Sequence, residues 1–196
     1  MIEKRKKVIA LVGPSGSGKD TLLRECVKVL PLKRIITCTT RPKRENEKDG
    51  IDYHFLSGKA FITKIANFEM LEVSSFKTNE GYWYYGTDIK ELDNDMINIG
   101  VFNMHSLSYL IQDGLVDIYP VYIKANDKDR LFRQLSRETE PNCLEICRRF
   151  ISDNQDFDNF EYKDKLLFYN NLEIQDIKNF PKILKNTALK SSDGWI

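Results

Sequence analysis

Histidine is scarce in this chain of 196 residues, and its four cysteines form no dense framework. The two histidines, His54 and His105, stand far in sequence from Cys143 and Cys147, the one cysteine pair spaced for a shared helix face. We therefore expect reduced thiols rather than a zinc site or a disulfide framework. The apolar run Val8–Val12, which follows a basic start, is too short for a signal or membrane-spanning segment, so a cytoplasmic protein is expected.

An excess of charge of either sign is also missing, since 30 lysines and arginines oppose 29 aspartates and glutamates. This balance provides no overall basic field for nucleic acid, and we expect neither a nucleic-acid partner nor a membrane partner. Hydrophobic residues make up 41% and charged residues 30%, which is typical of a folded domain. The length predicts a single domain over residues 1–196. The expected partners are small molecules, and the expected assembly is a monomer or homodimer.

Short apolar runs alternate with segments of helical periodicity, which predicts an α/β fold with a parallel sheet. The expected strands are Val8–Val12, Arg34–Cys38, Val101–Met104, Ile118–Ile123 and Leu166–Tyr169. The expected helices are Asp20–Val29, Ser106–Gln112, Lys128–Leu135, Leu144–Asp153 and Ile174–Leu184. The tail after Lys185 is polar, so a frayed end is expected.

The stretch from Thr39 to Thr87 has a different residue pattern from the rest of the chain. Residues Ser57–Asn67 have a helical pattern, for which Ser57 is a suitable N-cap. Residues Leu71–Thr87 are rich in aromatic and β-branched side chains, which favour strands. We expect a small β-rich subdomain, 39–87, inserted over one end of a core formed by 1–38 and 88–185.

A glycine-rich run follows the first expected strand and opens the first expected helix, which is the context that a phosphate-binding loop requires. Glycines allow consecutive backbone N–H groups to face one anion, and the helix N-terminus adds a positive dipole end. Lysine adds a charge for the β- and γ-phosphates of a nucleotide. The alternative is a plain strand-to-helix turn with an exposed lysine. The predicted ATP-binding residues here are Gly13, Ser15, Gly16, Ser17, Gly18, Lys19, Asp20 and Thr21.

Asp20 departs from the usual pattern of such loops, in which a serine or threonine hydroxyl follows the lysine and binds Mg²⁺. A carboxylate is also a hard oxygen ligand, so Asp20 is a candidate metal ligand. Alternatively, Asp20 only caps the helix, since an anion is favoured at a helix N-terminus. The sequence leaves both interpretations open.

Arg41, Pro42 and Arg44 form a stiff cationic segment, and the planar guanidinium fork suits a phosphate dianion. The alternative is a solvated basic loop whose charge is offset by nearby acids, namely Glu45, Glu47 and Asp49. Downstream lie Glu72 and the aromatic run 81–87, which ends at a threonine. A buried glutamate beside a threonine hydroxyl can recognise the N–H edge and the carbonyl of a purine. The alternative role for the aromatic rings is packing within a small sheet.

These segments resemble the guanylate kinase family, over roughly Val8 to Asn170. The most specific matches are Gly-Pro-Ser-Gly-x-Gly-Lys at 13–19, Thr-Thr-Arg-Pro-x-Arg at 39–44, Asp-Gly-x-Asp-Tyr-His-Phe at 49–55 and Tyr-Tyr-Gly-Thr at 84–87. The resemblance implies an α/β fold of the P-loop NTPase type, with a three-layer parallel sheet, an inserted β-rich subdomain for a nucleoside monophosphate, and a helical lid at about 133–153.

The resemblance also implies roles for individual residues. The phosphate of GMP would be held by Arg41, Arg44, Tyr53 and Tyr85, and the guanine by Thr37, Glu72 and Thr87. The transferring phosphates would meet Lys19 and the lid-side residues Arg133, Arg137, Arg148 and Arg149, while Asn170 would lie near adenine. The implied reaction is ATP-dependent phosphorylation of GMP or dGMP with Mg²⁺.

Asn103 and His105 stand where the family usually carries two aspartates. Their presence and the Gly-Lys-Asp ending of the phosphate loop also resemble a kinase of phosphonate breakdown, which converts a ribose bisphosphate to phosphoribosyl diphosphate. That family generally lacks a clear match to residues 49–55, so it ranks second. A third hypothesis is a catalytically silent module that keeps the fold for protein contacts; the intact Lys19 and arginine pair count against it.

Overall fold

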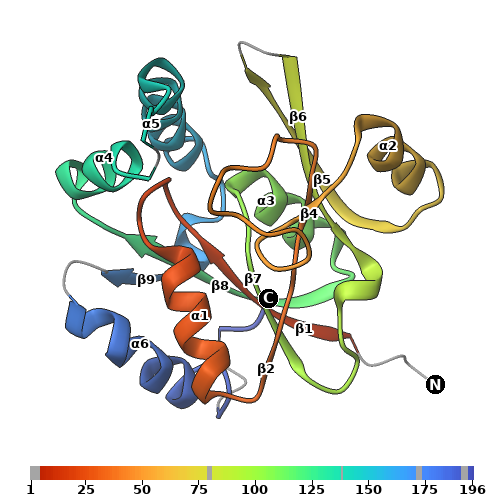
Figure 1. Ribbon diagram of the computed structural model, residues 1–196. Helices are drawn as coiled ribbons and strands as arrows, with labels where there is room; N and C mark the ends of the chain where they lie inside the picture. Colours follow the sequence, from red (N-terminus) through yellow and green to blue (C-terminus); the bar gives the residue numbers. More distant parts are fainter. Residues whose placement is uncertain (1–4, 79–80, 138, 171–173, 191–193) are drawn as a thin grey trace.

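The computed structural model describes residues 5–78, 81–137, 139–170, 174–190 and 194–196. The described residues form a central parallel sheet of five strands and a second sheet of four strands beside it (Figure 1). The central sheet has the order β2 (Leu32–Arg34), β7 (Ile97–Val101), β1 (Lys6–Val12), β8 (Val116–Lys124) and β9 (Leu167–Asn170). The second has the order β4 (His54–Phe55), β3 (Cys38–Thr39), β6 (Gly81–Asp88) and β5 (Met70–Thr78).

The middle strand β1 shows why the central sheet has helices on both faces. Its residues Val8 to Val12 are all apolar and fully buried. Because side chains alternate across a strand, Val8 and Ala10 pack on one side with α3 (Met104–Asp113). Ile9 and Leu11 pack on the other side with α1 (Lys19–Val29) and α6 (Ile174–Asn186). This is the three-layer arrangement expected of a parallel sheet buried on both faces.

The second sheet and α2 (Gly58–Ala66) occupy the stretch between Cys38 and Asp88, where the inserted subdomain is expected. The predicted N-cap is confirmed, since the Ser57 hydroxyl accepts a hydrogen bond of 3.2 Å from the backbone N–H of Ala60. Phe61 on α2 is fully buried and its ring lies 5.8 Å from that of Tyr84. This packing seats the helix on the β5–β6 hairpin.

Helices α4 (Asp127–Leu135) and α5 (Cys143–Asp158) rise on the side opposite to the β5–β6 hairpin (Figure 1). The expected lid, about 133–153, includes the end of α4 and most of α5, and residue 138 within it lies outside the described residues. Two 3₁₀ turns, Ile89–Glu91 and Lys163–Lys165, complete the assigned elements of the described chain.

Two predicted strands are misplaced. The strand expected at Val101–Met104 is instead β7, Ile97–Val101, and Met104 already belongs to α3. The polar residue Asn98 interrupts the apolar pattern, so the sequence did not indicate a strand at this position. Asn98 is fully buried, and its side-chain amide donates to the backbone carbonyls of Lys7, Asp93 and Met96. Asn103 then caps α3 and begins that helix two residues before the predicted start.

The strand expected at Arg34–Cys38 is also wrong. Only its first residue belongs to β2, Leu32–Arg34, and its last residue begins β3 of the other sheet. The backbone N–H of Ile36 donates to the Glu91 carboxylate at 3.3 Å rather than to a strand, so pairing with the central sheet ends there. The chain uses these residues to cross from one sheet to the other.

The expectation of a frayed C-terminus is wrong for residues 187–190 and 194–196. Ile196 exchanges two backbone hydrogen bonds with Ile118, of 2.8 and 2.9 Å. The Trp195 ring lies 5.5 Å from that of Tyr119, and Ala188 is 2% exposed. The polar composition of the tail concealed these apolar residues, which dock on the central sheet. None of the helices in the described ranges is long and apolar enough to cross a membrane.

Candidate active site

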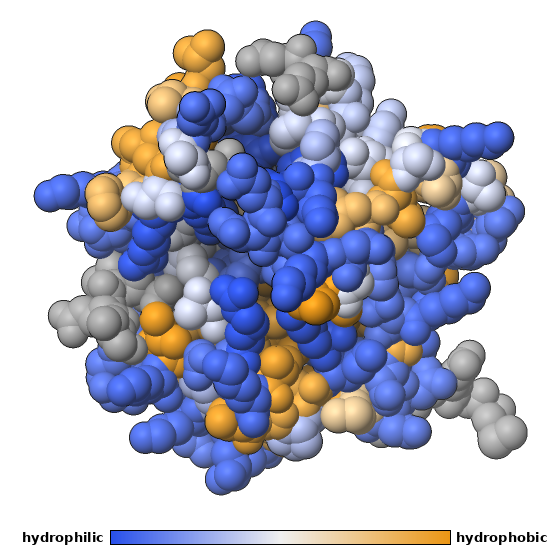
Figure 2. Space-filling model, viewed as in Figure 1, coloured by the Kyte–Doolittle hydropathy of each residue, from blue (hydrophilic) through white to orange (hydrophobic). Residues whose placement is uncertain are grey.

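A cavity of about 920 Å³ is enclosed by the β1–α1 loop, the second sheet and α5. Figure 1 places that loop between the α4–α5 pair and the second sheet, and Figure 2 shows mostly hydrophilic residues over this part of the same face. Many of the predicted site residues line it, although they come from distant parts of the sequence. They are Gly13, Ser15, Gly16, Gly18, Lys19, Asp20, Thr37, Arg41, Arg44, Tyr53, Glu72, Tyr85, Arg137, Arg148 and Arg149.

The β1–α1 loop has the backbone that a phosphate cradle needs. Gly13 has φ +139°, and a Cβ there would lie 2.5 Å from the carbonyl oxygen of Ile123. Gly16 has φ +79°, and its Cβ would lie 2.5 Å from the carbonyl oxygen of Arg130. Only glycine fits two positions that combine a left-handed backbone with contact this close. The loop thus packs tightly against β8 and α4 with its backbone facing the cavity.

Lys19 lies at the start of α1 and folds back over the loop. Its ammonium group donates to the carbonyl oxygens of Gly13 and Pro14, at 2.7 and 2.9 Å. Burial lowers the pKa of Lys19, while the charges of Asp153 and Asp20 act in the opposite direction. The ammonium group is therefore held beside the cavity with carbonyl partners that an anionic phosphate can replace.

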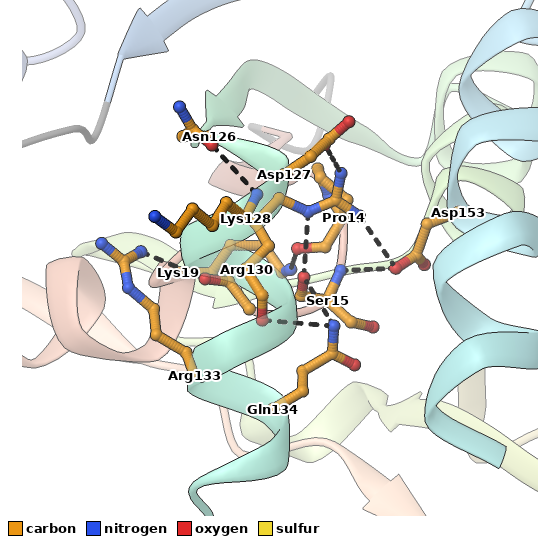
Figure 3. A network of polar contacts seen from close by, with 11 residues as sticks. Pro14, Ser15, Lys19, Asn126, Asp127, Lys128, Arg130, Arg133, Gln134 and Asp153 are labelled. Carbon is orange, nitrogen blue, oxygen red and sulfur yellow. Dashed lines mark hydrogen bonds and ion pairs between the residues drawn. The ribbon is translucent and has the colours of Figure 1, made fainter. Parts of the chain in front are cut away.

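An acidic side chain from α5 already occupies an anion position of the loop (Figure 3). The backbone N–H of Ser15 donates to the Asp153 carboxylate at 2.6 Å, and Arg130 approaches the same oxygen at 3.7 Å. Arg130 is 2% exposed, donates to the Ser15 carbonyl at 3.2 Å and lies over the Phe150 ring. A loop N–H that holds a carboxylate has the direction and charge environment needed to hold a phosphate oxygen.

Some predicted nucleotide residues lie beside the main cavity rather than on it. Among the residues that the structure describes, Ser17, Thr21 and Arg133 do not line it. Arg133 instead donates to the Gly16 carbonyl at 3.1 Å and so supports the loop (Figure 3). Asn170 lines a neighbouring cavity of about 350 Å³ that also reaches the loop at Pro14.

The predicted phosphate clamp of the acceptor is built on Arg41, which is 5% exposed. Its two terminal nitrogens bind the two oxygens of Glu47 at 2.9 and 2.7 Å, and its guanidinium lies over the Tyr53 ring. Burial raises the pKa of Glu47, but the hydrogen bonds and charge of Arg41 outweigh it and hold that pKa below its ordinary value. Tyr85 packs against Tyr53, and burial raises the pKa of Tyr53.

Glu72, the residue predicted to recognise the acceptor base, is 3% exposed and lies on β5. The hydroxyl of Thr87 donates to its Oε1 at 2.8 Å, and the hydroxyl of Ser106 donates to its Oε2 at 2.5 Å. Burial raises the pKa of Glu72, and these two hydrogen bonds oppose the rise. Thr87 is fully buried and is not among the described cavity-lining residues, so its link to the cavity is the hydrogen bond to Glu72.

The two α5 arginines that were predicted to lie on a lid share one carboxylate, to which the sequence pattern assigned no role. Arg148 binds Glu145 through two hydrogen bonds of 2.8 Å, and Arg149 binds it through another of 2.8 Å. Hydrogen bonds from Arg148 lower the pKa of Glu145, burial raises it, and the hydrogen bond from Arg149 lowers it again, so that the pKa lies below its ordinary value. The spacing of three and four residues on one helix was the available signal. Arg149 also lies over the Trp83 ring of β6, at 5.1 Å.

The residues that replace the family's usual aspartates have other partners. Asn103 caps α3 by accepting a hydrogen bond from the Ser106 N–H, and it donates to the Ser74 hydroxyl at 2.7 Å. His105 has a 65% exposed side chain and lies 3.6 Å from Asp156 on α5. Within the described ranges, no group of three or more metal-ligating side chains forms a metal site.

A glycine cradle with a lysine, facing buried arginine and glutamate side chains across one cavity, defines a P-loop phosphotransferase with a phosphorylated acceptor. Comparison with known proteins agrees. A family profile described as guanylate kinase matches residues 5–186. A guanylate kinase of Campylobacter jejuni is 30% identical over 172 residues, covering 85% of this chain and 82% of that protein. A guanylate kinase of Helicobacter hepaticus is 36% identical over 142 residues, 68% of each chain.

This chain therefore belongs to the guanylate kinase family and is a nucleoside monophosphate kinase. The crystal structure of guanylate kinase from Anaplasma phagocytophilum covers 100% of this chain and 93% of that chain, with a TM-score of 0.65. At 18% sequence identity, that likeness concerns the fold. The fold expectation of a P-loop α/β domain is thus confirmed.

Proposed function

We propose that this chain transfers the γ-phosphate of ATP to GMP or dGMP and forms the corresponding diphosphate. The observation that carries the proposal is the shared cavity, which Lys19 lines on the loop side and Arg41 and Glu72 line on the acceptor side. The two nucleotides would meet with their phosphates between α1 and the second sheet. In that arrangement a phosphate oxygen of GMP attacks the γ-phosphorus, the bond to the β–γ bridging oxygen breaks, and ADP leaves.

Catalysis would consist largely of positioning and charge neutralisation, because phosphoryl transfer needs little covalent help from the protein. The loop N–H groups and Lys19 would hold the phosphates of ATP, and Asn170 would lie near its adenine. Arg41, Arg44, Tyr53 and Tyr85 would hold the phosphate of GMP, and Arg137, Arg148 and Arg149 would neutralise the transferring group. Closure of the inserted subdomain and the lid would exclude water from the ATP. The enzyme would act in the cytoplasm, as a monomer or homodimer.

Mg²⁺ fits this site as an ion that binds together with the nucleotide rather than as an ion that the protein holds by itself. The glycine cradle leaves room for phosphate, and Asp20 lines the same cavity with an exposed carboxylate. When bound with ATP, Mg²⁺ supplies positive charge to the phosphate oxygens. We propose Asp20 as its ligand from this chain, because magnesium is usually held by one or two carboxylates together with substrate phosphates.

The buried Glu72 separates the first candidate function from the second. A ribose bisphosphate acceptor presents phosphates and hydroxyls to Arg41 and Arg44 but has no N–H edge for a carboxylate held by two hydroxyls. Guanine has such an edge, since its N1–H and amino group both donate. The arrangement of Glu72, Thr87 and Ser106 therefore favours GMP over a ribose bisphosphate.

A coupled assay of ADP release tests the proposal. The wild-type protein with ATP and Mg²⁺ is given GMP, dGMP, AMP, UMP or a ribose bisphosphate in separate reactions. We expect rapid turnover with GMP and dGMP and little with the others. Absence of GMP turnover at millimolar substrate, with turnover of the ribose bisphosphate, would replace the first candidate by the second. Absence of turnover with every acceptor would favour the silent module.

A further inference from the structure

Ser106 lies where the core and the inserted subdomain meet, and no sequence motif assigns it a role. It belongs to the first turn of α3, where its backbone N–H donates to the side-chain oxygen of the N-cap Asn103 at 2.8 Å. That bond fixes the position of Ser106 relative to the end of β7. Ser106 is 2% exposed, and it lines the cavity.

The side chains of this turn reach across to β5 at two points. Ser106 donates to Glu72 at 2.5 Å, and the Asn103 amide donates to the hydroxyl of Ser74, two residues further along β5, at 2.7 Å. Residues 72 and 74 lie on the same face of a strand, so both bonds hold one face of β5 against the start of α3. Thr87, from β6, holds the other oxygen of Glu72.

We propose that Ser106 is a positioning residue for the acceptor base, because its hydroxyl fixes the Glu72 carboxylate that guanine must meet. This inference rests on the proposed GMP kinase function. Each oxygen of a carboxylate has about two acceptor positions. With one taken by Thr87 or Ser106, each oxygen keeps an acceptor position for guanine N1–H or its amino group. Adenine has an acceptor at N1, which faces repulsion from the same carboxylate.

The position of His105 increases the dependence on Ser106. His105 is the residue immediately before Ser106 on α3, but it pairs with Asp156 on α5 and its side chain is largely exposed. It is not among the described residues that line the cavity. Guanine selectivity consequently depends on how firmly Glu72 is held, and loss of one of its two hydroxyl donors lets the carboxylate turn.

The test compares Ser106→Ala and Ser106→Cys with the wild type in steady-state assays with GMP, AMP and ATP as varied substrates. Alanine removes the donor, and cysteine nearly preserves the volume with a weak donor. A hydrogen bond to a charged group is worth enough that we expect KM for GMP to rise roughly 10-fold or more. We expect kcat to change less than threefold and KM for ATP to stay constant. The preference for GMP over AMP falls by a similar factor.

Ser108→Ala is the matched control, since Ser108 lies on the same helix, is partly exposed and does not line the described cavity. We expect it to behave as the wild type. If the wild type is active and both Ser106 variants keep an unchanged KM for GMP, the inference about Ser106 is overturned while the proposed GMP kinase function stands. An equal loss for GMP, AMP and ATP accompanied by a lower melting temperature, which indicates a structural role, would overturn it as well. A wild type inactive on GMP but active on a ribose bisphosphate would remove the proposed function, and the inference with it.

Discussion

The two sides of the cavity present different kinds of groups for the phosphates that we propose they bind. On the nucleotide side, the proposed binding groups are Lys19 and backbone N–H groups of one short loop, where Gly13 and Gly16 fit because any Cβ would strike a neighbouring backbone. On the acceptor side, the proposed binding groups are side chains from β5, β6 and the segment around Arg41. Each of these charged groups has its own internal partner, such as Glu47 for Arg41 and two hydroxyls for Glu72.

This difference has an energetic cause. A backbone loop carries no net charge, so an anion site made from it needs no counter-ion in the free protein. A buried guanidinium is costly unless it is paired and hydrogen-bonded. Arg41 therefore needs Glu47, and the α5 arginines share Glu145. We expect substitutions on the nucleotide side to affect activity and those on the acceptor side to affect selectivity or stability as well.

The largest expected effect is that of Lys19→Met, which leaves the backbone cradle in place but removes its charge. Loss of one preorganised charge at a transition state typically costs roughly 10²–10³-fold in rate, and we expect kcat to fall by about that factor. The fold should persist, because burial disfavours the charge of Lys19, as the lowered pKa of that residue indicates, and an uncharged methionine does not carry this cost. Steady-state kinetics and thermal unfolding measure the two properties separately.

The control for Lys19→Met is Lys28→Met, a change on the same helix at an exposed residue paired with Glu25. We expect it to keep both rate and stability. If Lys19→Met kept a wild-type rate, the loop would not be the phosphate site, and the contrast between the two sides of the cavity would fail.

The difference between a local backbone loop and side chains from distant segments also explains which parts of the site could be predicted from the sequence. The phosphate loop is local, so nine consecutive residues and the elements on either side were enough to predict it. The acceptor residues were predicted by type, together with a threonine beside Glu72, but the partner of Arg41 and the second hydroxyl on Glu72 were not. Glu47 was considered a charge offset for a basic loop, and it is the partner that orients Arg41.

Ser106 and Glu145 were missed for related reasons. Ser106 meets Glu72 across 34 positions of sequence, through a strand boundary that the buried polar Asn98 concealed. Glu145 does lie within four residues of both arginines, but without the geometry it looks like an ordinary exposed helix charge. Local composition predicts secondary structure and loop chemistry, whereas these contacts depend on how two sheets are placed.

The second prediction concerns selectivity on the acceptor side. In Glu72→Gln, one oxygen becomes an amide that donates toward guanine instead of accepting from it. A buried site with a mismatched hydrogen-bonding group loses about 2–4 kcal/mol, so we expect kcat/KM for GMP to fall roughly 30- to 1000-fold. Activity with AMP should change far less. Assays of both acceptors on the variant and the wild type measure the ratio.

Arg41→Ala serves as the comparison for Glu72→Gln, because a phosphate is common to all acceptors. It should reduce kcat/KM for GMP and AMP by similar factors. A uniform loss in Glu72→Gln as well would contradict the assignment of Glu72 to the base.

The third prediction concerns the pH dependence of stability. The pKa of Glu47 in the folded protein lies below its ordinary value near 4.5, so its ionised form stabilises the fold at higher pH. That stabilisation should be lost as the pH falls below about 4.5 and through the lower folded value. Glu47→Gln removes the partner of the buried Arg41, and we expect a loss of roughly 3 kcal/mol at neutral pH with a flatter acid limb.

Denaturant unfolding from pH 7 to pH 3 measures this effect, with Glu25→Gln as the control. Glu25 forms an exposed pair with Lys28, and such pairs contribute less than about 1 kcal/mol. Equal changes in the two variants would show that Arg41 does not depend on its partner.

We expect the smallest effect from substitutions of Asp20, which lies on the nucleotide side but, unlike the loop N–H groups, offers a side chain. It is the second residue of α1, whose N-cap Gly18 has no side-chain cap bond, so Asp20 affects the helix through charge rather than capping. If Asp20 binds Mg²⁺ directly, Asp20→Ala raises the Mg²⁺ concentration for half-maximal activity several-fold, and Asp20→Ser, which supplies a hydroxyl ligand, restores much of it. If it acts only on the helix dipole, both variants lose about 0.5 kcal/mol of stability and keep the wild-type Mg²⁺ titration. We expect the first result, because the carboxylate lines the cavity beside the phosphate cradle.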